Sequence, residues 1–116
     1  MAEPDALLDV HVTCPDAATA EAIGRAALEA RLCACAQVGA PIRSLYWWQG
    51  AIVEDDEVPL VMKTSARHFD AIAALVTRLH PYDVPAVTAH PVARAGRGVP
   101  EWVAEETRVR HDAAHD

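Results

Sequence analysis

Two cysteines and a histidine are the residues of this chain best suited to bind a metal ion. Cys33 and Cys35 are separated by one residue, so an extended backbone places both thiols on the same face of a strand. Thiolates are soft ligands that suit Cu(I), and the imidazole of His80 or His11 can complete such a site. The alternative is that both cysteines are small packing residues and that the His80 side chain caps the end of a helix. As metal ligands we predict Cys35 and His80.

An enzymatic use of Cys35 is the weakest alternative, because spacing assigns it neither a general base nor an orienting group. We therefore predict that the chain is not an enzyme and has no catalytic residues. Lys63, at the end of a predicted strand, can neutralise an anionic ligand or form a surface ion pair, and both roles stay open.

Four consecutive acidic residues, Glu54 to Glu57, also invite a metal-binding interpretation. Consecutive carboxylates on a strand point alternately to opposite faces, so they cannot all reach one ion. We predict instead that they are solvated and protect a sheet edge.

Composition limits the partners of the chain. A net charge of -7 argues against nucleic acid or an anionic membrane as partner, because both require a basic face. The sequence contains no apolar run long enough to cross a membrane, and its first residues do not resemble a signal peptide. These features predict a cytoplasmic protein, in which the 3 cysteines are reduced thiols. The 116 residues contain no linker, which predicts a single domain over 1–116 with an ordered core over about 6–110.

The aromatic stretch from Ser44 to Gly50 predicts the tip of a long β-hairpin. Its residues favour extended backbone, and Gln49-Gly50 can form the turn. Arms of about a dozen residues reach ~40 Å, which exceeds the ~35 Å diameter of a compact domain of this size. The tip therefore overhangs the domain and exposes aromatic rings, which is typical of an interaction site. Pro59 lacks a backbone donor, so we expect a bulge, a ladder gap or a sheet edge beside it.

The order of elements predicts an α+β fold. Leu8, Val10 and Val12 alternate with polar residues, which is typical of a strand, whereas Phe69 to Leu79 shows the period of an amphipathic helix. The expected elements are a strand over 6–13, a helix from Asp16 to about 31, hairpin arms over 33–47 (interrupted at 39–41) and 50–63, a helix capped by Ser65 and ending near His80, a strand over 87–92, and a helix over 100–110. This order is that of a ferredoxin-like βαββαβ sandwich with a long central hairpin and a short C-terminal helix.

Several motifs in this order resemble those of the divalent-cation-tolerance (CutA) family. The two most specific are Tyr46-Trp47-Trp48-Gln49-Gly50 and His80-Pro81-Tyr82-Asp83-Val84-Pro85. Residues 31–35, 63–64 and 101–102 add to the similarity, which extends from about Leu8 to Arg108.

The resemblance implies a homotrimer of ferredoxin-like subunits whose hairpins pair between chains and leave a pocket at each subunit boundary. It also implies a link to copper and other divalent cations. We expect Lys63, Trp48 and Tyr82 to line the ligand pocket, with packing across an interface as the alternative for the two aromatic residues. The competing function is a PII-like trimeric signalling or scaffold module that binds a small ligand or a protein partner at the cleft between subunits.

Overall fold

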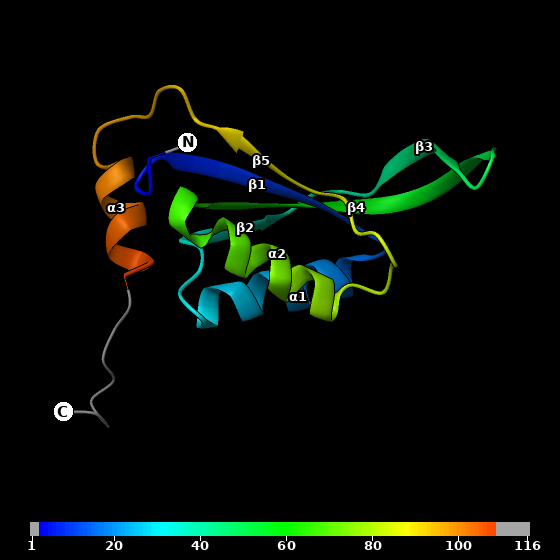
Figure 1. Cartoon of the computed structure of the whole chain (residues 1–116), viewed down its shortest axis with the longest axis horizontal. Helices are drawn as coiled ribbons and strands as arrows, with labels where there is room; N and C mark the ends of the chain where they lie inside the picture. The colour runs from blue at the N-terminus through cyan, green and yellow to red at the C-terminus, as the bar shows by residue number, and fades with distance from the viewer. Residues whose placement is uncertain (1–2, 109–116) are drawn as a thin grey trace.

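Five β-strands and three α-helices make up residues 3–108, the part of the chain that this computed structural model describes. In chain order they are β1 (Leu7–Cys14), α1 (Ala17–Glu29), β2 (Cys35–Val38), β3 (Ile42–Trp48), β4 (Ala51–Ser65), α2 (Phe69–Leu79), β5 (Val87–Pro91) and α3 (Val99–Glu106), with a 3-10 turn over Ala66–His68 before α2. The antiparallel sheet has the order β2-β4-β1-β5, and β3 pairs with the outer part of β4. Helices α1 and α2 cover one face of this sheet (Figure 1). The predicted α+β, ferredoxin-like arrangement is confirmed.

The core lies between this sheet and the two helices. Val10 and Val12 of β1 are 0% and 2% exposed, because alternate residues of the strand point toward α1 and α2. Gly24 brings α1 close to β2, since a Cβ atom at this position would lie 2.8 Å from Cβ of Ala36. Ala36 therefore faces the helices, and its neighbours Cys35 and Gln37 face the opposite side of the sheet.

The predicted hairpin projects from the body of the domain (Figure 1). Trp48 pairs with Ala51, and both turn residues have positive φ, 49° at Gln49 and 81° at Gly50, as a type I′ turn requires. The chain measures 52 × 35 × 27 Å along its principal axes, and Trp47 near the tip is 72% exposed. The predicted overhang and its exposed aromatic surface are therefore confirmed.

A bulge separates β2 from β3 opposite Pro59, as the sequence predicted. Val38 pairs with Leu60 whereas Ile42 pairs with Glu57, so the first arm contains one residue more than the second across this interval. The Pro59 carbonyl accepts from the Gly39 N–H at 2.9 Å. In an antiparallel strand the N–H and C=O of one residue face the same neighbour, so the N–H that Pro59 lacks is missing on the side of the bulge.

The ends of the helices match the predictions only in part. Asp16 caps α1, because its Oδ1 accepts from the Thr19 N–H at 2.8 Å, and this bond lowers the pKa of Asp16. The prediction that Ser65 caps the second helix is wrong, since Ser65 ends β4 and its side chain makes no capping bond. The 3-10 turn over Ala66–His68 follows Ser65 and leads into α2, which begins at Phe69. Among residues 3–108, no helix is long and apolar enough to cross a membrane.

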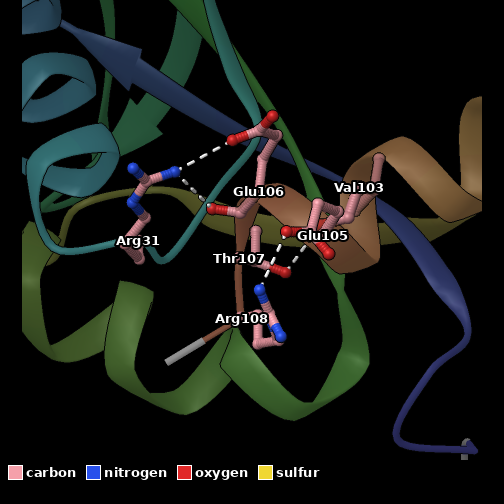
Figure 2. Close-up of polar contacts among 6 residues, drawn as sticks. All are labelled: Arg31, Val103, Glu105, Glu106, Thr107 and Arg108. Atoms are coloured by element: carbon pink, nitrogen blue, oxygen red, sulfur yellow. Dashed lines mark hydrogen bonds and ion pairs between the residues drawn. The ribbon is translucent and has the colours of Figure 1, made fainter. Parts of the chain in front are cut away.

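The C-terminal helix is held against the end of α1. Arg31 has a φ of 60° and follows α1, and its Nη1 donates to the Glu106 carbonyl and carboxylate at 3.2 and 2.9 Å (Figure 2). The Thr107 hydroxyl donates to the Val103 carbonyl at 2.7 Å. Helix α3 thus ends at Glu106, short of the predicted end, and residues 109–110 of the prediction lie outside the described part of the chain.

Candidate functional site

A cleft of about 700 Å³ lies beneath the projecting hairpin, beside the loop that connects α2 to β5. Tyr46 and Trp48 line it from β3, Glu57 from β4 and Thr13 from β1, while Tyr82 lines it from the loop. The hairpin and the loop after α2 are therefore the two segments that form the site. Both contain the motifs that the sequence singled out.

Two tyrosine–carboxylate pairs give the cleft its polarity. The Tyr82 hydroxyl donates to Glu57 Oε2 at 3.0 Å, and the Tyr46 hydroxyl donates to Asp55 Oδ2 at 2.5 Å. Burial, followed by the bond to Glu57, raises the pKa of Tyr82 to about 12, and the bond to Asp55 raises the pKa of Tyr46 to about 12. None of the described residues that line the cleft is basic. The arrangement suits a neutral or cationic ligand better than an anion.

The acidic run on β4 divides between two faces, as predicted. Glu54 and Asp56 accept from Arg43 at 3.1 and 3.3 Å on one face. Asp55 and Glu57 turn the other way and accept from the two tyrosines. Glu57 is only 5% exposed, so the prediction of a solvated role is wrong for this residue.

His80 bridges β1 and the loop after α2. Its Nε2 lies 2.7 Å from the Thr13 carbonyl oxygen, and its Nδ1 accepts from the Tyr82 N–H at 3.2 Å. Because the carbonyl can only accept and the amide can only donate, the hydrogen of the ring resides on Nε2. The alternative that the His80 side chain caps α2 is wrong, since its ring nitrogens contact Thr13 and Tyr82, which lie outside α2, and only the backbone N–H of His80 bonds to the helix, at the Val76 carbonyl. Both ring nitrogens are engaged within the chain.

Cys33 and Cys35 differ in their surroundings. Cys33 is 2% exposed and belongs to the core, where burial raises the pKa of its thiol to about 12. Cys35 is half-buried and begins β2 on the face of the sheet opposite the helices. Of the two thiols, only that of Cys35 is therefore partly accessible to solvent.

The predicted ligands Cys35 and His80 lie apart within the chain. Cys35 pairs with Lys63, which pairs with Asp9 of β1, whereas the His80 ring contacts Thr13 further along that strand. The four residues from Asp9 to Thr13 correspond to ~13 Å along the sheet. Among residues 3–108, no three His, Cys, Asp or Glu side chains converge as a metal centre.

Lys63 does not belong to the cleft that Trp48 and Tyr82 line. Its Nζ donates to Asp9 Oδ1 at 2.7 Å, and the two side chains are 27% and 30% exposed. The alternative of an ion pair is the one observed. Of the three residues predicted for a ligand pocket, the fold brings Trp48 and Tyr82 together and places Lys63 elsewhere.

Sequence reasoning missed the two carboxylates that bind the tyrosines. The alternation along β4 already put Asp55 and Glu57 on one face, but no local pattern indicates that this face turns toward Tyr46 and Tyr82.

Comparison with known proteins agrees with the motifs and the fold. The family model described as CutA1 divalent ion tolerance protein matches residues 8–106. The divalent-cation tolerance protein CutA of Thermus thermophilus is 39% identical over 98 residues, which cover 84% of this chain and 95% of the relative. Protein CutA of Homo sapiens is 36% identical over 110 residues, which cover 95% of this chain and 62% of the longer human protein.

A solved structure extends this similarity to three dimensions. The structure described as the periplasmic divalent cation tolerance protein CutA from Archaeoglobus fulgidus is similar with a TM-score of 0.85 and 29% identity, and the match covers 88% of this chain and 99% of that one. The family match runs from the second residue of β1 to the last residue of α3. The chain belongs to the CutA1 divalent ion tolerance protein family.

Proposed function

We propose that this chain forms a homotrimeric divalent-cation-tolerance protein in the cytoplasm, where it binds copper or another divalent cation and contributes to the metal-ion response without acting as an enzyme. The single observation that supports the proposed trimer is the projecting hairpin. Beyond Val58 the strand β4 pairs only with β3 among the described residues, so backbone groups along the hairpin have unpaired edges. Partner hairpins would satisfy these edges and cover the exposed rings.

The cation is proposed to bind near a subunit boundary, with Cys35 as its soft ligand. The thiol is half-buried on the open face of the sheet and takes no part in a disulfide. Soft thiolates select copper over calcium or magnesium. His80 is the proposed second ligand, and because it lies far from Cys35 in one chain, a site using both takes them from two subunits. His80 must then release the Tyr82 N–H or the Thr13 carbonyl.

Titration with Cu(I) under anaerobic, reducing conditions tests this site. The wild type, Cys35→Ser, His80→Ala and the double variant are compared, with Cys33→Ala as the control for loss of a buried thiol. We expect Cys35→Ser to weaken binding most while light scattering still reports a trimer. Equal Cu(I) affinity in the wild type and these three variants contradicts both proposed ligands. If Cys35→Ser loses Cu(I) binding and His80→Ala keeps it, Cys35 is a ligand and His80 is only structural.

The cytoplasmic location is supported by the three unpaired thiols of the described chain, which suit a reducing compartment. The Archaeoglobus relative is described as periplasmic, so compartments within the family differ. Cell fractionation, with detection of the untagged protein by an antibody raised against it, tests the assignment. Recovery of the protein from an oxidising compartment contradicts it.

A second candidate, the PII-like module, is favoured by the cleft between the hairpin and the α2–β5 loop. Its aromatic walls and the buried Glu57 suit a small organic cation, which an aromatic ring and a carboxylate attract together. Thermal shifts of the trimer with choline and with inorganic phosphate distinguish the two charge types. We expect stabilisation by choline that Trp48→Ala removes, and stabilisation by phosphate alone contradicts this candidate.

A further inference from the structure

A second, smaller pocket lies between the C-terminal turn of α3 and the 3-10 turn that precedes α2. Its volume is about 260 Å³, which is small for an organic cofactor but sufficient for an ion of the size of phosphate. Apart from Ala104, every described residue that lines this pocket is polar, and Arg67 and Arg108 are basic. The cleft under the hairpin has no basic residue among its described lining, so the two cavities suit ligands of opposite charge.

The pocket belongs to the end of the molecule opposite the hairpin, where α3 lies (Figure 1). The C-terminal turn of α3 lies beside the helix layer, because Arg31, which follows α1, bonds to Glu106 (Figure 2). The 3-10 turn leads from β4 into α2, which is part of the same layer. The hairpin edges on which the proposed trimer depends belong to β3 and the outer part of β4, and no residue of these edges lines the pocket.

The hydroxyl of Ser65 points to a ligand in this pocket. Ser65 is 4% exposed, and its hydroxyl has no hydrogen-bond partner among residues 3–108. No described side chain has a polar atom that is both unpartnered and sealed from solvent, so this hydroxyl opens into the pocket that Ser65 lines. Buried polar groups normally have a partner, which a ligand in the pocket would supply. The Thr107 hydroxyl, in contrast, already donates to the Val103 carbonyl.

Both arginines of the pocket keep donors for an anion. Arg67 pairs with Asp5, and Arg108 pairs with Glu105 at 3.0 Å, in each case through Nη2. A guanidinium group has five N–H donors, so neither pair uses all of them. The side chains of Asp5 and Glu105 are 80% and 54% exposed, and ion pairs in such surroundings are weak. An anion in the pocket can therefore compete with them.

His68 adds a neutral donor to the lining. Burial, followed by the charge of Arg67, lowers the pKa of His68 from its usual value of 6.5. The imidazole is therefore neutral above pH 7 and carries one N–H, and no hydrogen bond to residues 3–108 occupies its ring nitrogens. Among the described lining residues Asp5 is the acidic one, so the two arginines leave the pocket with a net positive charge.

We propose that this pocket binds a small oxyanion of the phosphate class. Arg67 and Arg108 bond to its charged oxygens, because a planar guanidinium matches the spacing of two phosphate oxygens. Ser65 and His68 donate an O–H and an N–H to the remaining oxygens. Asp5 opposes the anion and competes with it for Arg67. The pocket shares no residue with the proposed cation ligands or with the cleft, so this proposal can fail while the others stand.

Calorimetric titration of the assembled full chain with inorganic phosphate tests the pocket, at constant ionic strength in a buffer without other oxyanions. We expect Arg67→Gln and Arg108→Gln each to weaken phosphate binding by ~10-fold or more, as loss of a hydrogen bond to a charged group does. Ser65→Ala should weaken it by a similar factor. Arg97→Gln, which removes the same charge from the loop before α3, is the matched control and should bind as the wild type does.

Asp5→Asn separates a binding role from a structural one. Loss of a competing carboxylate should tighten phosphate binding by ~3-fold, whereas loss of an ion pair that only holds the pocket together would weaken it. Glycerol 3-phosphate distinguishes the source of the anion, since tighter binding than that of phosphate favours an ester and weaker binding favours the free ion.

Light scattering and urea unfolding verify that every variant assembles and folds as the wild type does. Absence of saturable binding at millimolar phosphate overturns the proposal. Equal phosphate affinity in the wild type, Arg67→Gln and Arg108→Gln, or weaker binding in Asp5→Asn, overturns it as well.

Discussion

At the scale of single residues, burial separates the three thiols. Cys14 is 0% exposed, and burial raises the pKa of its thiol to about 11, with the charges of Asp16 and Glu57 adding to the effect. Cys33 is 2% exposed within the core, and burial raises the pKa of its thiol to about 12. At pH 8 the Cys14 thiol is therefore ionised in about one molecule in 1,000 and the Cys33 thiol in about one in 10,000. Because only the ionised thiolate attacks alkylating reagents, both thiols should react slowly.

We therefore predict that iodoacetamide modifies Cys35 before the other two cysteines at pH 8. The half-buried Cys35 is reached by the reagent without unfolding, so its modification should be at least ~10-fold faster. Peptide mass spectrometry over a time course measures each rate. Cys35→Ser should then remain unmodified in the folded state, and rapid labelling of Cys33 would show that the core opens.

The two tyrosines of the cleft make stability depend on pH in the alkaline range. The pKa of Tyr82 rises from 10.0 to about 12, chiefly through burial and then through its bond to Glu57. Between these values the unfolded chain loses the hydroxyl proton while the folded chain keeps it. The free energy of unfolding is therefore unaffected below pH 10 and falls as the pH rises from 10 to 12.

Tyr82→Phe should remove part of this alkaline loss of stability. Tyr46, whose pKa is also raised to about 12, continues to contribute, so the decline becomes shallower rather than absent. Urea unfolding at pH 9, 10 and 11 gives the slope for each protein. Identical slopes would mean that Tyr82 ionises in the folded chain as readily as in the unfolded chain.

At the scale of elements, the bulge between β2 and β3 depends on a glycine beside a proline. A Cβ atom at Gly39 would lie 2.8 Å from Cγ of Pro59, whose ring cannot rotate away. We predict that Gly39→Ala destabilises the fold by about 1–3 kcal/mol, as overpacking of a filled site does. Gly96→Ala is the matched control, because no atom lies within 4 Å of the added methyl group.

A double-mutant cycle with Pro59→Ala assigns this cost to the pair. Removing the ring should make Gly39→Ala less harmful, with a coupling energy in the range of about 0.5–3 kcal/mol that is typical of residues in contact. Chemical denaturation of the four proteins measures it. Additive effects would place the cost in the backbone of Gly39 rather than in the contact.

At the scale of the whole molecule, the hairpin separates chain stability from assembly. Trp47 is 72% exposed and Ile52 is 61% exposed, so neither side chain contributes much to the fold of one subunit. If partner hairpins cover them, Trp47→Ala should weaken trimer formation by about 2 kcal/mol or more, as loss of a central aromatic contact does.

Sedimentation over a range of micromolar concentrations measures the effect on assembly. Trp102→Ala, which removes a 41% exposed indole from α3, is the control and should leave assembly unchanged. A wild type that stays monomeric at micromolar concentration would contradict the proposed trimer.

Local chemistry determined most of the fold. Alternation along β1, the Asp16 cap, the Gln49-Gly50 turn and the missing donor of Pro59 each act within a few residues, so the sequence alone predicted the strands, α1, the hairpin and the bulge. Helix α2 starts later than predicted because Ser65 continues β4.

Only the tertiary structure decided which side chains meet. Lys63 finds Asp9, His80 finds Thr13, and His11 lies beside His90 because strands distant in sequence pair in one particular register. The alternation of buried residues along a strand excludes a shift of one residue, which would reverse its faces, but it does not distinguish registers that differ by two residues. The sequence therefore identified the motifs that form the cleft. The tertiary structure decided that Trp48 and Tyr82 line the cleft together and that Lys63 does not. The register of the sheet also placed Cys35 and His80 apart within one chain.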